Sequence, residues 1–140
     1  MRVLNLLLPI LLIIGIVSCS SNVYYCNSND PNNYCKDVII TQKEIGNWNQ
    51  GNRGGAEYTQ WEVTLENKLD FSLTQFYILR DYTLKIRDRK SIWNVQEIES
   101  TNNLILPTYQ NSIGSKSNWI FGFILQDSEP ANLTLEAISF

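Results

Sequence analysis

The chain has 140 residues, of which 44% are hydrophobic and 18% are charged, and its formal net charge is -3. This length and composition are typical of one folded domain and exclude a disordered chain. The negative charge gives no basic excess for nucleic acid, and the absence of histidine removes the commonest general base and metal ligand. We therefore expect no nucleic-acid partner, no metal and no cofactor.

The first 20 residues are typical of a cleaved secretory signal peptide. Arg2 supplies a positive start, residues 6–17 form a short apolar run, and small residues follow at 18–21. The run is short for a membrane span, so we expect cleavage near residues 18–21, secretion, and no membrane contact afterwards. Two alternatives stay open: a bacterial lipobox that would place a lipid on Cys19, and an uncleaved anchor.

Residues 21–36 form a polar, asparagine-rich lead-in with turn-forming residues. Since Cys19 lies at or before the predicted cut, Cys26 and Cys35 are the two cysteines left in the exported chain. A pair that closes a short loop in a secreted protein indicates a disulfide. A metal site is the weaker alternative, because two cysteines alone cannot complete tetrahedral coordination.

From residue 37 onward the pattern is that of β-strands. A first strand is predicted at 38–45, followed by a glycine-rich loop at 47–56 and a second strand at 57–67. The second strand alternates most clearly, with Trp61, Val63 and Leu65 on one face and Tyr58 on the other. Further strands are predicted at 71–79, 82–86, 92–98, 104–106, 118–125 and 133–138.

These short strands, without intervening helices, predict an all-β fold for residues 37–140. An antiparallel β-sandwich of immunoglobulin-like or jelly-roll type is favoured over a barrel. The last strand contains a glycosylation sequon at Asn132, and an unmodified asparagine is an equally good interpretation.

Catalysis is not expected. The acidic residues form no recognisable facing pair, and a serine or cysteine nucleophile would lack histidine. A small hydrolase therefore stays only a weak hypothesis. The basic residues between 80 and 90 alternate with aspartates, which indicates a solvated edge or loop.

The aromatic content, 4 Trp, 7 Tyr and 5 Phe, is high for this length. Flat aromatic rings bind sugars by packing against the apolar C–H face of the sugar ring. By alternation, Trp61 and Trp119 belong to the core and Tyr58 faces outward. Trp48, in the predicted loop, is expected to be exposed, and the pattern leaves Trp93 undecided.

Residues 37–140 carry a series of short motifs in a characteristic order. A VIITQ strand precedes a loop with tryptophan and glycine, and the other motifs are Tyr58–Asn67, Ser91–Val95, Leu106–Tyr109, Ile120–Ile124 and Glu129–Ala131. In this order they resemble carbohydrate-binding module family 49. That family is the cellulose-binding domain of some plant endoglucanases and of small secreted slime-mould proteins.

The resemblance implies a non-catalytic β-sandwich that binds cellulose or a similar β-glucan in an extracellular matrix, coat or wall, with matrix proteins as further partners. It assigns the sugar contacts to Trp48, Tyr58 and Trp93, with Tyr109 as either a fourth contact or a packing residue. The loop from Trp48 to Tyr58 is longer than in the plant modules, which leaves the relative placement of these two rings open. The competing hypothesis is an adhesion or structural sandwich whose partner is a protein.

Overall fold

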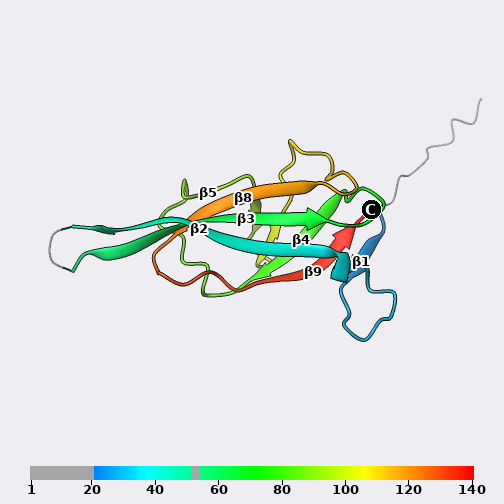
Figure 1. Cartoon of the computed structure of the whole chain (residues 1–140), viewed down its shortest axis with the longest axis horizontal. Coiled ribbons are helices and arrows are strands. Elements are labelled where there is room, and N and C mark those ends of the chain that lie inside the picture. The colour runs from blue at the N-terminus through cyan, green and yellow to red at the C-terminus, as the bar shows by residue number, and fades with distance from the viewer. Residues whose placement is uncertain (1–20, 52–53) are drawn as a thin grey trace, which may run out of the picture.

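The computed structural model describes residues 21–51 and 54–140, and in these ranges the chain folds into nine strands and one short 3-10 helix (Figure 1). The predicted signal peptide, with Cys19, lies outside the described residues. The elements are β1 (Val23–Tyr25), η1 (Tyr34–Asp37), β2 (Val38–Gln50), β3 (Ala56–Asn67), β4 (Gln75–Arg80), β5 (Ile92–Trp93), β6 (Gln96–Ile98), β7 (Asn103–Ile105), β8 (Asn118–Leu125) and β9 (Leu133–Ser139).

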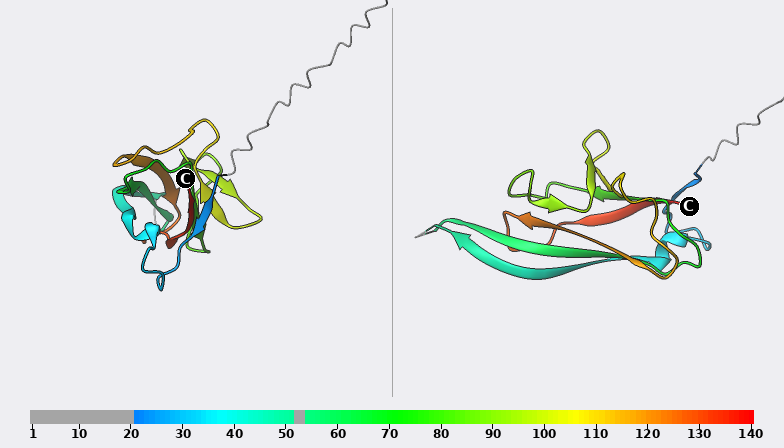
Figure 2. Two further views of the ribbon diagram at one scale, coloured as in Figure 1. Left: turned by 90° about the vertical axis from the view of Figure 1, so that its right-hand side faces the viewer. Right: turned by 90° about the horizontal axis from the view of Figure 1, so that it is seen from above.

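The strands form two antiparallel sheets that pack face to face, which confirms the predicted sandwich (Figure 2). One sheet has the order β1-β9-β4-β7-β6 and the other has the order β2-β3-β8-β5. The chain passes from one sheet to the other between Trp93 and Gln96. Asn94, in this crossing, has a φ of 58°, a conformation that asparagine tolerates better than most residues. Among the described residues, no helix is long and apolar enough to cross a membrane.

The core lies between the sheets and follows the predicted alternation. Trp61, Val63 and Leu65 of β3 face inward, and Trp61 is only 7% exposed. They pack in one cluster with Phe76 of β4 and Phe121 of β8, whose ring centroids are 6.3 Å apart. Neighbouring residues of a strand point to opposite faces. The residues of β3 that alternate with Trp61, Val63 and Leu65 therefore lie on the outer face of the four-stranded sheet.

The hairpin β2–β3 is longer than predicted and extends beyond the ends of the neighbouring strands (Figure 1). The sequence suggested that β2 ends at Ile45 and that a loop begins at Asn47. Instead, a bulge between Glu44 and Gly46 lets β2 continue to Gln50. The polar residues after the bulge stay extended because they pair with β3 across the hairpin, which local composition does not reveal.

Other boundaries also differ from the prediction. β4 begins at Gln75 instead of residue 71, and residues 82–86 form no strand beyond one bridge between Ile86 and Leu125. The segment 92–98 contains two strands in different sheets, β5 and β6. β1 was not anticipated, because three residues in an asparagine-rich segment show no measurable alternation, and the strand depends on its pairing with β9.

Cys26 and Cys35 form the predicted disulfide. The loop that they close is joined to β1 by the Tyr24 hydroxyl, which donates to Asp30 at 2.6 Å. This hydrogen bond lowers the pKa of Asp30 below its usual value. The backbone N–H of Cys26 donates to the carbonyl of Glu136 at 2.8 Å and so prolongs the pairing of β1 with β9.

Asn132 directly precedes β9, which begins at Leu133, the residue at which the last strand was predicted to begin. Its side-chain amide donates to Asp81 at 3.0 Å, and its backbone N–H donates to the Thr83 hydroxyl at 2.7 Å. Hydrogen bonds from Thr83 and Asn132 lower the pKa of Asp81. The side chain of Asn132 is exposed, and its glycosylation stays a prediction.

Candidate functional site

Three of the four aromatic residues selected from the sequence lie on the outer face of the four-stranded sheet. Trp48 of β2 is the direct cross-strand partner of Tyr58 of β3, and directly opposed residues in an antiparallel pair share a face. Trp93 of β5 is opposite Gly122 of β8, which is opposite Glu62 of β3. Since Tyr58 and Glu62 are four residues apart on one strand, all these residues belong to the same face.

Trp48 and Tyr58 form a neighbouring pair of rings. Their centroids are 6.1 Å apart and their planes are inclined by 32°. Trp48 is 37% exposed, as predicted, although it lies in a strand and not in a loop. The long hairpin therefore brings these two rings together. The sequence had left their relative placement open because of the length of the predicted loop.

Trp93 lies across β8 because Gly122 has no side chain. A Cβ at Gly122 would lie 2.4 Å from Cζ2 of Trp93, well inside contact distance. The pairing of β5 with β8 settles the orientation that the sequence pattern left undecided, and it places Trp93 on the outer face, half-buried.

The aromatic face, defined by Trp48, Tyr58, Trp93, Gly122 and Ile124, extends along the sheet. Ile124 is opposite Gln60 of β3, between the row of Tyr58 and the row of Glu62. Four residues along a strand correspond to about 13 Å, which separates the Trp48–Tyr58 row from the Trp93 row. A pair of rings and a single ring are therefore held on one sheet with an apolar side chain between them.

Arg87 stands beside this face and was missed by the sequence analysis. Its guanidinium carbon lies 5.9 Å from the centroid of the Tyr58 ring, in the range of a cation–π contact. Its Nε donates to Asp88 at 3.0 Å and to the Ser91 hydroxyl at 3.2 Å. The hydrogen bond from Arg87 is the main cause that lowers the pKa of Asp88.

Tyr109 lies near Trp93 but is held by other residues. Its side chain is 67% exposed, and its hydroxyl donates to the Asn94 side chain at 3.0 Å. The Trp119 indole donates to the Asn94 carbonyl at 2.8 Å, and the rings of Tyr109 and Trp119 are 6.4 Å apart. Trp119 is only partly buried at the margin of the core, whereas the alternation had suggested a full core position.

The arrangement is suited to binding an extended ligand with apolar and polar surfaces. Aromatic rings on the outer face offer area for dispersion contact. Half-buried Gln60 lies between the two aromatic rows, and half-buried Glu62 lies in the row of Trp93. In the ranges 21–51 and 54–140, histidine, cysteine, aspartate and glutamate form no group of three or more that could hold a metal ion.

Comparison with known proteins identifies the family. Residues 38–126 match the carbohydrate-binding domain CBM49. The chain is 42% identical to stalk-specific protein A of Dictyostelium discoideum and 40% identical to stalk-specific protein B, in each case over 79% of this chain and 71% of the relative.

Among solved structures, the fold is similar to part of an inactive mutant of the GH20 exo-β-N-acetylglucosaminidase of Vibrio harveyi. The match has a TM-score of 0.51 and 9% identity, and it covers 71% of this chain but 17% of that one. At this identity the likeness concerns the fold alone. The profile match spans both rows of the aromatic face, and with the two relatives it shows that this chain belongs to the CBM49 family of carbohydrate-binding domains.

Proposed function

We propose that this protein is a secreted, non-catalytic protein that binds cellulose or a related β-glucan through its aromatic face. Trp48, Tyr58 and Trp93 would contact the polysaccharide, and Tyr109 would add a fourth contact. The observation that carries the proposal is the presence of Trp48, Tyr58 and Trp93 on one outer face of a sheet in a member of a carbohydrate-binding family.

The physical basis is the match between aromatic rings and the C–H faces of an extended glucan chain. Each ring contributes dispersion and burial of apolar area without a deep pocket. Gln60, between the two aromatic rows, and Glu62, in the row of Trp93, would meet sugar hydroxyls, and Arg87 lies beside the Tyr58 ring. An uncharged glucan suits a face built mainly of rings.

The proposed location is an extracellular matrix, coat or wall. The disulfide between Cys26 and Cys35 supports passage through an oxidising compartment. The names of the two relatives associate them with the stalk of Dictyostelium discoideum, which supports a role in an extracellular structure. The absence of catalysis is supported by the family, whose matched domain is a binding domain.

The test is a pull-down of residues 21–140 on microcrystalline cellulose, acid-swollen cellulose and chitin. A Trp48→Ala/Trp93→Ala variant removes one ring from each aromatic row. We expect wild type to sediment with cellulose and the variant to sediment much less. Tyr82→Ala is the matched control, because Tyr82 is an aromatic residue that is 83% exposed but lies outside the aromatic face.

Circular dichroism and thermal unfolding of each variant separate loss of binding from loss of fold. If the folded double variant sediments as well as wild type, the aromatic face is not the site. If wild type sediments with none of the polysaccharides, glucan binding is wrong and the adhesion hypothesis, with a protein partner, becomes the leading one.

A further inference from the structure

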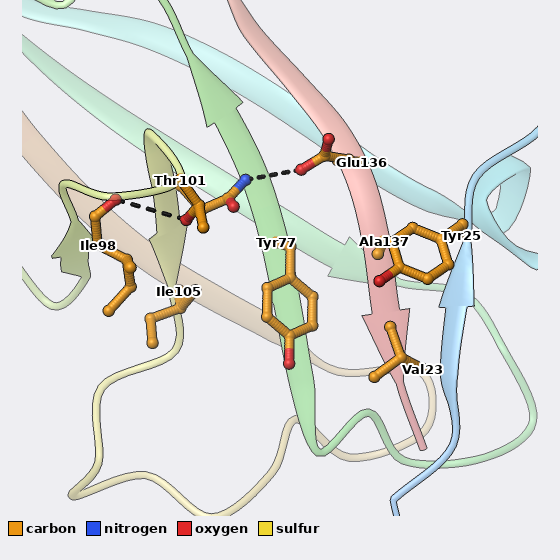
Figure 3. Close-up of a pocket in the computed structure, with 9 residues that line it drawn as sticks. Val23, Tyr25, Tyr77, Ile98, Thr101, Ile105, Glu136 and Ala137 are labelled. Atoms are coloured by element: carbon orange, nitrogen blue, oxygen red, sulfur yellow. Dashed lines mark hydrogen bonds between the residues drawn. The ribbon is translucent and has the colours of Figure 1, made fainter.

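A concave surface lies on the outer face of the five-stranded sheet, on the opposite side of the sandwich from the aromatic face. It is a groove of about 450 Å³ between Tyr25 of β1, Tyr77 of β4 and Ile105 of β7. Figure 3 shows Tyr77 between Ile105 on one side and Val23 and Tyr25 on the other. The volume is within the range of small-ligand sites, which is roughly 300–1,000 Å³.

The groove exists because Ala137 lies in its floor. Ala137 of β9 is the cross-strand partner of both Tyr25 and Tyr77, and Tyr77 is also opposite Ile105. A single methyl group between two tyrosines leaves a hollow that a larger side chain would fill. Tyr25, Ala137, Tyr77 and Ile105 lie side by side on β1, β9, β4 and β7. An extended ligand in the groove would therefore lie across the strands.

One wall of the groove is polar. The Asn103 side chain, which is only 5% exposed, donates to the Glu136 carboxylate at 2.9 Å. Glu136 itself is exposed, so its carboxylate retains lone pairs that face the groove and solvent. The groove therefore combines tyrosine rings and aliphatic side chains with an oriented acceptor.

We propose that this groove is a second carbohydrate site, which takes a short segment of a single neutral β-glucan chain. A pyranose offers an apolar C–H face to Tyr25 and Tyr77 and hydroxyl donors to Glu136. The choice of a glucan rests on the function proposed above. With the aromatic face on the other side, each molecule would bind two separate chains and join them.

The polar wall argues against the other occupants of an apolar groove. An apolar peptide or an acyl chain would remove water from the Glu136 carboxylate and supply no donor, which costs free energy. An anionic polysaccharide would be repelled by the same carboxylate. A neutral sugar chain satisfies the carboxylate and covers the rings.

Cellohexaose, titrated into residues 21–140 that carry Trp48→Ala/Trp93→Ala, tests the groove directly. Because the aromatic face is disabled in this background, we expect saturable NMR shifts of the methyl groups of Ile98, Ile105 and Ala137. Adding Tyr25→Ala should raise the dissociation constant of cellohexaose at least about tenfold, which corresponds to the loss of one ring contact. Absence of shifts in the groove up to millimolar cellohexaose would overturn the proposal.

The bridging consequence is tested with suspended cellulose microcrystals. Wild type should aggregate them, while Tyr25→Ala and, separately, Ala137→Leu should still sediment with cellulose but lose aggregation. Tyr25 is 70% exposed, so its truncation should leave the fold intact, and Tyr82→Ala serves as control. Unchanged aggregation by both groove variants would contradict the proposal. Failure of the aromatic face appears instead as equal sedimentation of wild type and the Trp48→Ala/Trp93→Ala variant, while the NMR titration measures binding in the groove separately.

Discussion

At the scale of single residues, Gly122 determines where Trp93 lies. A Cβ at this position would lie 2.4 Å from Trp93 and 2.8 Å from the Trp61 carbonyl oxygen. We predict that Gly122→Ala displaces the Trp93 ring, lowers the free energy of unfolding by about 1–3 kcal/mol, and weakens glucan binding about tenfold. Urea denaturation and a cellulose binding isotherm measure the two effects.

Gly46→Ala is the matched control for this substitution. Gly46 lies opposite Gln60, on the same outer face, and a Cβ there meets no atom within 4 Å. It adds the same methyl group to the same sheet without disturbing a ring. Equal losses of binding in both variants would show that the position of Trp93 does not matter.

Local alternation predicts the orientation of some candidate site residues and not of others. Tyr58 alternates with the buried Trp61 and Val63, so its outward direction follows from one strand. Trp93 lies in a two-residue strand, and its side depends on pairing with β8 far along the chain. Arg87 was missed for the same reason, because its contact with Tyr58 joins segments that are distant in sequence.

At the scale of elements, the disulfide joins Cys26, the residue after β1, to Cys35 of η1, which packs against the core. The closed loop is short, with a sequence separation of 9, and β1 has only three residues of pairing. We predict that Cys26→Ser/Cys35→Ser lowers the free energy of unfolding by about 2–3 kcal/mol, mainly through the entropy of the unfolded chain. Denaturant unfolding with and without reductant checks the value.

This loss should be local as well as global. Because β1 carries Val23 and Tyr25, the variant should lose amide-exchange protection at β1 and with it one wall of the groove. Protection of β3 and β8, which hold the aromatic face, should change only in proportion to global stability. An unchanged denaturation midpoint, or equal loss of protection in every strand, would contradict the prediction.

Elements were predictable to different degrees for a physical reason. β8 and β3 carry long runs of alternating buried residues, and their bounds agree with the sequence prediction to within one residue. β1, β5 and β6 are two or three residues long and exist through their partners, so no local pattern marks them. The distal part of β2 is polar apart from Trp48, and only its pairing with β3 keeps it extended.

At the scale of the whole molecule, the two sheets bury one face each against the core and leave two outer faces of different character. The aromatic face is open and carries rings in two rows, while the opposite face is hollowed around Ala137. The groove on the five-stranded sheet has no signal in the local sequence pattern, because it depends on the order of four strands. A sandwich of this kind can therefore offer two separate binding surfaces from one small core.

The last prediction concerns the dependence of binding on salt. The molecule has a net charge of -3, and its aromatic face binds through rings, so attraction between opposite charges should contribute little to glucan affinity. We expect the dissociation constant on acid-swollen cellulose to change less than about twofold between roughly 0.05 and 1 M sodium chloride, although salt screens exposed charges strongly over this range. A binding isotherm at each salt concentration measures it. Weakening by tenfold or more would show that charged side chains such as Arg87 dominate, and the ligand would then have to be an anionic polymer or protein.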